Sequence, residues 1–188
     1  KIYYDSQYFK NRLNLNGEIF NNPIVFSLKN DFNKKDFNFD IKFDKLGVHF
    51  KNDINYQDTK KVGSTIVSSF GKKYSINYFF DDKRLEFFSG KKIGDANLYD
   101  GKATLKPFFL NVNINLIDLS LIDLVKSESL FMKLMRSNIF LNENLNLIVN
   151  LKSQNVTDYR FLKNLFLKIE LNQGLLNIKD TTLDFSEI

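Results

Sequence analysis

Residues able to act as acids, bases or metal ligands are few in this chain. Cysteine is absent and His49 is the single histidine, which excludes thiol catalysis, thiolate metal sites and disulfides. A metal site would need carboxylates alone, and no aspartate-rich loop has calcium-binding spacing. His49 stands between Val48 and Phe50 in an alternating stretch, which places it on the polar face of a strand. We interpret it as a surface residue.

The remaining candidate motifs also favour structural roles. Asp81 and Asp82 could serve as acid and base, but they fall in a predicted hairpin turn, where aspartate is favoured for backbone reasons. The stretch 90–94, GKKIG, is a basic turn without the spacing of a phosphate-binding loop. The stretch 155–157, NVT, matches the short glycosylation sequon. We therefore expect no enzymatic activity, no catalytic residue, no metal and no cofactor.

Length and composition indicate a globular chain with a sizeable core. The 188 residues are 43% hydrophobic and 26% charged, and they include 20 Phe and 8 Tyr. No apolar run approaches the roughly 20 residues that span a bilayer, and no signal peptide is recognisable. From its first and last residues we expect the chain to be an excised segment of a longer protein.

The chain is basic, with a formal charge of +5 and a pI of about 9.2. Four lysine pairs lie in or beside predicted turns: Lys34-Lys35, Lys60-Lys61, Lys72-Lys73 and Lys91-Lys92. The favoured interpretation is solvated turns and protected strand edges. The alternative is attraction to anionic head groups or nucleic acid. Because the aromatics alternate with aliphatics along whole strands, we expect a buried face and no nucleic-acid partner.

Period-two alternation of apolar and polar residues dominates the sequence and predicts β-strands. Short polar turns separate successive strands, which favours an antiparallel meander. Three segments, near 37–56, 74–88 and 165–178, share a weak hairpin repeat. We expect one mainly β domain over 1–188, a strongly curved antiparallel sheet with short helices near 120–136 and 157–163. The apolar even-numbered residues of 108–116 should share its concave face with 145–151 and 165–171.

A family resemblance enters at 101–125, GKATLKPFFLNVNINLIDLSLIDLV. This stretch resembles repeats of the AsmA-like family of bacterial envelope proteins, which includes TamB-type and YhdP-type members. Gly101, Pro107, the alternating run 110–116 and the two Asp-Leu pairs follow the family's order. The C-terminal NLFLKIELNQGLLNIKDTTLDF and the hairpin around NGEI and PIVF are similar to its other repeats. The family's N-terminal membrane anchor is missing from this stretch of sequence.

The resemblance implies a half-open, taco-like β-groove in the periplasm of a Gram-negative bacterium. Its apolar wall would hold acyl chains and conduct phospholipid between inner and outer membranes, without catalysis. An anchor outside this segment would attach it to the inner membrane, and other envelope proteins are candidate partners. The expected lining residues are Phe39, Ile41, Phe43, Val48, Phe50, Ile76, Tyr78, Phe80, Phe108, Leu110, Val112, Ile114, Leu116, Leu145, Leu147, Val149, Leu167 and Ile169.

An alternative is a closed β-sandwich or barrel that acts as a scaffold or adhesion module of the envelope. In that arrangement the same apolar residues would pack against a facing sheet about 10 Å away. The sequence pattern is common to both, because alternation shows only that one face of each strand avoids water.

Overall fold

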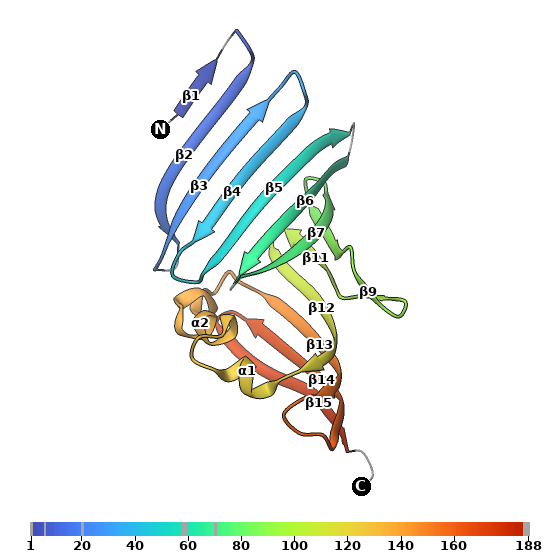
Figure 1. Ribbon diagram of the computed structural model, residues 1–188. Coiled ribbons are helices and arrows are strands. Elements are labelled where there is room, and N and C mark those ends of the chain that lie inside the picture. The colour runs from blue at the N-terminus through green and yellow to red at the C-terminus, as the bar shows by residue number, and fades with distance from the viewer. Residues whose placement is uncertain (1, 6, 20, 58–59, 70, 186–188) are drawn as a thin grey trace. The chain divides into compact units, whose positions relative to one another are not determined.

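The chain divides into two compact units, Lys1–Phe87 and Phe88–Ile188, and each is described by itself (Figure 1). The computed structural model describes residues 2–5, 7–19, 21–57, 60–69 and 71–185, with the backbone alone at 56, 57 and 60. The expectation of a single domain over 1–188 stays a prediction.

Unit 1 is built from strands that follow one another in the sheet in sequence order (Figure 1). Every pair from β1 to β7 is antiparallel. The strands are β1 (Ile2–Asp5), β2 (Lys10–Ile19), β3 (Asn22–Asp31), β4 (Asp36–Phe43), β5 (Val48–Gln57), β6 (Lys60–Ser69), β7 (Lys72–Phe80) and β8 (Arg84–Ser89). The segments 37–56 and 74–88 each form a hairpin.

Short polar turns at 32–35, 44–47 and 81–83 join strands of unit 1, as the sequence predicts. At the end of β7 the Asp81 carboxylate accepts hydrogen bonds from the backbone N–H groups of Lys83 and Arg84, both at 2.8 Å. These two bonds lower the pKa of Asp81. The turn before β5 contains Gly47, whose φ of 66° is readily reached only without a side chain. The interpretation of Asp81 as a turn residue is confirmed.

Unit 2 has a five-stranded sheet in the order β11-β12-β13-β14-β15, and a small hairpin of β9 and β10. Its elements are β9 (Lys92–Ile93), β10 (Ala96–Asn97), β11 (Tyr99–Leu105), β12 (Phe108–Leu119), α1 (Leu121–Val125), α2 (Leu130–Arg136), the 3-10 helix η1 (Asn138–Leu141), β13 (Leu147–Val156), β14 (Leu162–Asn172) and β15 (Leu175–Phe185). β12 begins directly after Pro107, and the segment 165–178 lies in the hairpin of β14 and β15.

One pair in unit 2 departs from the predicted meander. β12 and β13 run parallel, and the helical segment between them makes the crossover. A parallel pair cannot be joined by a tight turn, so the helices occupy the connection that returns the chain to the start of the next strand. The other pairs of unit 2 with a described register are antiparallel.

The helix predicted near 120–136 is present as α1 and α2, whereas the helix predicted near 157–163 is wrong. There the chain makes a turn in which the N–H of Leu162 donates to the carbonyl of Tyr159 at 2.9 Å, and β14 follows at once. Asp158 lies in this turn and begins no helix. Its carboxylate instead accepts the N–H of Ile122 at 2.9 Å, at the start of α1.

Two side chains hold the N-terminus of α1. The Ser120 hydroxyl oxygen accepts the N–H of Asp123 at 2.9 Å, and the hydroxyl donates to the Asp158 carboxylate at 2.7 Å. The bonds from Ile122 and Ser120 lower the pKa of Asp158. The ionised Asp158 carboxyl therefore stabilises the folded state at any pH above the pKa that it has in the unfolded chain. This stabilisation is lost as the pH falls through the lower pKa that it has in the folded protein.

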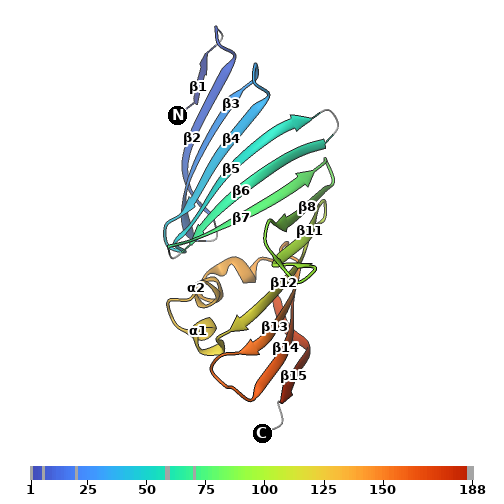
Figure 2. The same ribbon diagram turned by 45° about the vertical axis from the view of Figure 1, so that its right-hand side comes forward.

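The core of unit 2 lies between its sheet and α1. Four buried residues, Leu151, Val156, Leu162 and Leu165, form one cluster. Leu121 of α1 packs against this cluster together with Ile114, Leu119, Leu167 and Leu183. Both units are mainly β with mostly antiparallel, curved sheets that do not close, so the predicted fold class is confirmed (Figure 2). Among the described residues, no helix has the length and hydropathy needed to cross a membrane.

The cap of α1 gives a direct test of this packing. We expect Ser120→Ala to lower the free energy of unfolding by about 1 kcal/mol, because the N–H of Asp123 loses its acceptor. Chemical denaturation measures this change. Ser127→Ala, at an exposed serine between the two helices, should leave stability unchanged. Equal stability of Ser120→Ala and the parent would show that this cap does not secure α1.

Candidate functional site

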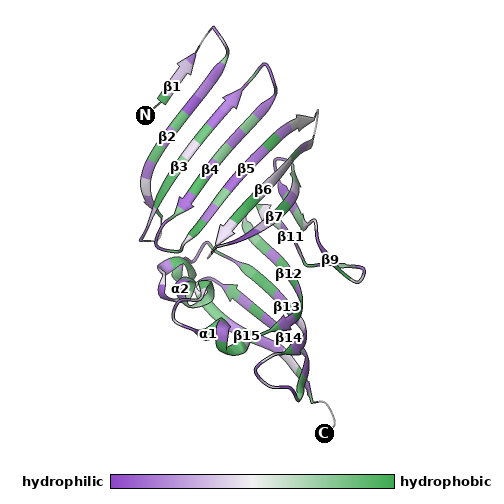
Figure 3. Cartoon of the chain, viewed as in Figure 1, coloured by the Kyte–Doolittle hydropathy of each residue, from purple (hydrophilic) through white to green (hydrophobic). Residues whose placement is uncertain are grey.

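The most extensive surface feature of unit 1 is a continuous apolar face. The register from β2 to β7 runs without a shift, so the residues of one face lie directly opposite one another across each pair of strands, and most of them are apolar (Figure 3). Its apolar residues are Leu13, Leu15, Ile19, Ile24, Phe26, Leu28, Phe37, Phe39, Ile41, Phe43, Val48, Phe50, Ile54, Val67, Tyr74, Ile76, Tyr78 and Phe80. Among the described residues of unit 1 there is neither a helix nor a second sheet to cover them.

Aromatic rings fill the middle of this face. Phe39 lies between Phe26 and Phe37, with ring centroids 6.1 and 6.0 Å away. Phe43 and Phe50 meet edge to face at 6.2 Å across β4 and β5. Such contacts add to the stabilisation from burial alone. They give the single-layered sheet an ordered apolar surface.

All eight lining residues predicted in unit 1 lie on this face. They are Phe39, Ile41, Phe43, Val48, Phe50, Ile76, Tyr78 and Phe80. The prediction omitted the neighbouring residues of β2 and β3, including Phe26 and Leu28, although the same alternation runs through them. The cross-strand register now places those strands in the same surface.

A hydrogen-bonded group of polar side chains lies within the apolar face. Asn52 and Thr65, each 6% exposed, are directly opposite on β5 and β6, and the Thr65 hydroxyl donates to the Asn52 carbonyl oxygen. The Tyr78 hydroxyl donates to the same oxygen at 3.2 Å. Burial is the main cause that raises the pKa of Tyr78. Sequence reasoning missed Asn52 and Thr65. Each is a polar residue at a position where the alternation of its strand would place an apolar one, and this departure was the available signal.

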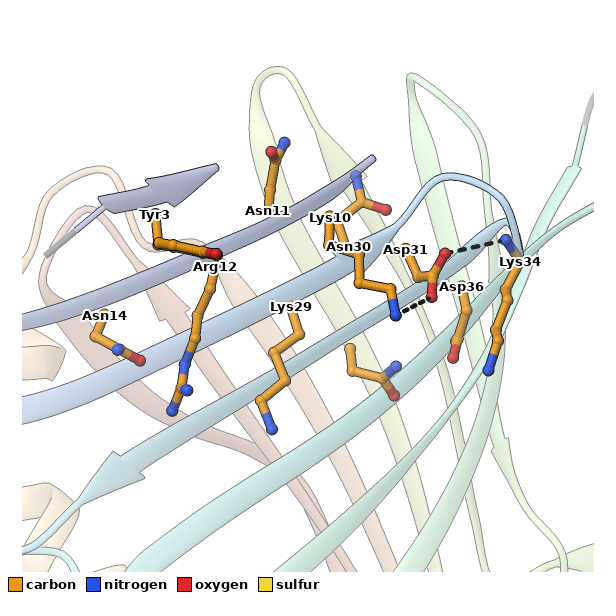
Figure 4. A pocket seen from close by; sticks show the side chains of 11 residues that line it. Tyr3, Lys10, Asn11, Arg12, Asn14, Lys29, Asn30, Asp31, Lys34 and Asp36 are labelled. Carbon is orange, nitrogen blue, oxygen red and sulfur yellow. Dashed lines mark hydrogen bonds and ion pairs between the residues drawn. The ribbon is translucent and has the colours of Figure 1, made fainter. Parts of the chain in front are cut away.

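The opposite face of unit 1 is polar and charged. A cleft of about 690 Å³ lies there, lined by Arg12, Lys29 and their neighbours (Figure 4). Lys10 pairs with Asp31 at 3.4 Å at its rim. This cleft lies away from the predicted lining residues, and its charged walls do not suit hydrocarbon.

His49 lies on that polar face, as predicted. Its Nε2 is 3.1 Å from the Asp40 carboxylate on the neighbouring strand. In the part of the chain that the structure describes, no group of three metal-ligating side chains comes together. The pair of His49 and Asp40 is a half-exposed surface contact.

The lining residues predicted in unit 2 share one face, with one exception. Leu110, Val112 and Ile114 are opposite Leu147, Val149 and Leu151, which are in turn opposite Leu171, Ile169 and Leu167. Phe108 and Leu116 continue the same alternation on β12. Leu145 is the exception, because it precedes β13, in a turn where its N–H donates to the carbonyl of Asn142 at 3.0 Å.

The apolar face of unit 2 is partly covered by protein. α1 contributes Leu121 to the cluster that includes Ile114 and Leu167, two predicted lining residues. Part of this surface is therefore an ordinary core between sheet and helix. The helical crossover explains the difference from unit 1, because a parallel pair needs a long connection and unit 1 has none.

The polar face of unit 2 carries a row of bonded amides. The Asn113 side chain donates to the Asp100 carboxylate at 2.8 Å and accepts from Asn150 at 3.1 Å. Asn150 also donates to Asn111 at 3.4 Å. Asn113 is therefore bonded to the strands on both sides of it.

The lysine pairs lie at strand ends, as predicted. Lys34 and Lys35 occupy the turn between β3 and β4, and Lys72 begins β7 directly after a turn. Lys61 extends over the ring of Phe80, 5.4 Å from its centroid. The side chain of Lys60 lies outside the described part of the chain. These positions fit solvated turns, and head-group attraction stays a prediction.

The comparisons with known proteins give no relative. No protein-family model, curated protein or solved structure matches the chain. The resemblance to the AsmA-like family therefore stays an expectation from sequence pattern.

The amide row of unit 2 leads to a charge test. We expect Asn113→Asp to lower the free energy of unfolding at neutral pH by about 1 kcal/mol, because two carboxylates would then face each other. When two carboxyl groups face each other, the pKa of one of them is raised. The loss of stability should therefore disappear as the pH falls through that pKa, towards about pH 4, because one carboxyl is then neutral. Chemical denaturation at both pH values measures the effect.

The matched control is Asn111→Asp, one pair further along β12. Asn111 is directly opposite Lys102, so the new carboxylate would face a cation and should not destabilise the sheet. Equal losses in both variants would mean that any charge on this face is harmful, and would refute the specific role of Asp100.

Proposed function

We propose that this chain is a segment of an AsmA-like periplasmic protein that binds acyl chains and conducts phospholipid between the inner and outer membranes. The observation that carries the proposal is the apolar face of unit 1, which extends over six strands without a covering layer in that unit. A surface of this extent is unusual on a soluble domain unless it has a ligand or a partner.

The size of the face suits hydrocarbon chains. Strands about 4.8 Å apart make the face from β2 to β7 roughly 24 Å wide. Its centre carries aromatic and aliphatic side chains, while Lys61 and Lys72 stand near strand ends. Burial of each methylene group contributes about 0.8 kcal/mol, so an extended acyl chain along this face would be held by many small contributions.

The remaining elements have supporting roles in the proposal. Unit 2 offers less open apolar surface because α1 packs on its sheet. A segment outside this stretch anchors the protein to the inner membrane, and other envelope proteins hand over or receive the lipid. The proposal requires no catalysis.

Two substitutions on β4 test the proposal with the same change of charge. Ile41→Asp introduces a carboxylate on the apolar face, where an unpaired charge beside hydrocarbon costs several kcal/mol. We expect phospholipid that co-purifies with the protein, measured by mass spectrometry, to fall more than tenfold. The melting temperature should change less, because the new charge can reach water once the lipid has left.

Asn38→Asp is the control, on the polar face of the same strand. It should keep its lipid, and its stability should change little, because the new carboxylate has Lys29 opposite it on β3 as well as Asp53 opposite it on β5. A parent protein free of lipid, with an Ile41→Asp variant that unfolds, would contradict the proposal and favour a scaffold in which this face packs against protein.

A further inference from the structure

We propose that the cleft on the polar face of unit 1 binds a sugar phosphate, a phosphate monoester whose organic part carries hydroxyl groups. The site lies beyond the proposed function, because this cleft is on the face opposite to the apolar one. Arg12 on β2 and Lys29 on β3 hold the phosphate group. Neither residue takes part in the proposed binding of acyl chains.

Arg12 and Lys29 form a pair of like charges across two strands. They are directly opposite in the register of β2 and β3, and both line the cleft, where their side chains extend in the same direction (Figure 4). Directly opposite residues have Cβ atoms about 5 Å apart, and like charges at this separation repel. Neither side chain forms an ion pair or a hydrogen bond with the residues that the structure describes. An anion between the two cations relieves their repulsion.

The carboxylates of the cleft belong to a different row of residues. Lys10 pairs with Asp31 at 3.4 Å, and the other oxygen of Asp31 accepts the backbone N–H of Lys34 at 3.3 Å. Asp36 is directly opposite Asp31 on β4. Among the described lining residues these two aspartates are the acidic ones, and both stand in the row beside the β3–β4 turn. The uncompensated positive charge of the cleft therefore lies at the Arg12 and Lys29 pair.

Two neighbouring cations match a ligand with two negative charges. A phosphate monoester carries a charge of about −1.5 to −2 at neutral pH. A phosphodiester, such as the head-group phosphate of a membrane phospholipid, carries only one. The guanidinium of Arg12 can contact two phosphate oxygens at once, while the ammonium of Lys29 adds a compact charge. The pair therefore favours a monoester over a lipid head group.

The rest of the cleft suits an organic part with hydroxyl groups. Asn38 continues the row on β4, and Asn14 and Asn30 also line the cleft. Amide side chains both donate and accept hydrogen bonds, as hydroxyl groups do. On the other side, β1 places the exposed ring of Tyr3 directly opposite Arg12. The volume of about 690 Å³ is in the range of sites for small molecules.

Glucose 6-phosphate is the probe that tests this site. It is titrated into the protein at low ionic strength, because salt screens exposed charges, and binding is followed by NMR of the backbone amides. We expect glucose 6-phosphate to bind about fivefold more tightly than inorganic phosphate, since its hydroxyl groups add a neutral hydrogen bond. The shifted signals should be those of β2 and β3. Glucose alone should not bind.

Arg12→Gln and Lys29→Gln should each weaken the binding of glucose 6-phosphate at least tenfold, because each removes a charge-assisted hydrogen bond. Both residues are exposed and the change relieves a repulsion, so the melting temperature without ligand should not fall. Asn38→Asp keeps both cations but gives Lys29 a carboxylate directly opposite it, and it should weaken binding too. Lys42→Gln is the matched control, an exposed lysine of the polar face outside the cleft, and it should bind like the parent.

Four results would overturn the assignment. They are absence of binding by the parent, undiminished binding by Arg12→Gln and Lys29→Gln, an equal loss in Lys42→Gln, and inorganic phosphate binding as tightly as glucose 6-phosphate. A vesicle arm tests the membrane as occupant. Phosphatidylglycerol vesicles that bind through Arg12, when glucose 6-phosphate does not, would replace the sugar phosphate with a lipid surface. The lipid content of Ile41→Asp is measured separately on the opposite face, so each proposal can fail alone.

Discussion

The hydrogen-bond register between neighbouring strands decides what each face of unit 1 contains. Side chains alternate along a strand, so a shift of one residue in the pairing of β4 would exchange its two faces. Phe39 and Ile41 would then point to the polar side, and Asp40 and Lys42 to the apolar side. From β2 to β7 no such shift occurs, and apolar residues meet across every pair. The aromatic contacts, the polar opposite face and the proposed lipid site all depend on this uninterrupted alignment.

The same constraint gives asparagine opposite roles in the two units. Asn113 lies on a polar face, where neighbouring strands supply both its donor and its acceptor. Asn52 lies on an apolar face, where its side chain bonds to the hydroxyl groups of Thr65 and Tyr78 on the two following strands. The residue type is identical, and the face to which it is assigned decides whether its partners are the amides and carboxylates of a polar surface or the hydroxyl groups of a small cluster among apolar side chains.

Much of the fold could be predicted because its determinants are local. Alternation gave the faces of β4, β5 and β12, and short polar turns gave the hairpins. The parallel pair of β12 and β13 could not be predicted this way, since it depends on where the helical segment packs. The expected helix at 157–163 failed for a related reason: the Asp158 carboxylate accepts a hydrogen bond from Ile122 of α1, 36 residues earlier in the chain. Asn52 was missed because its role depends on partners 13 and 26 residues away.

The sequence-order arrangement of unit 1 also bears on how the unit forms. Each strand from β1 to β7 pairs with its immediate neighbours in the chain, so every contact between strands closes only a short loop. Chains with such low contact order fold quickly, because little entropy is lost before pairing begins. Stability then resembles that of a linear array, in which each hairpin depends on its neighbours. Unfolding can therefore begin at β1 and proceed strand by strand, so the outermost hairpin should exchange its amide hydrogens before the middle strands do.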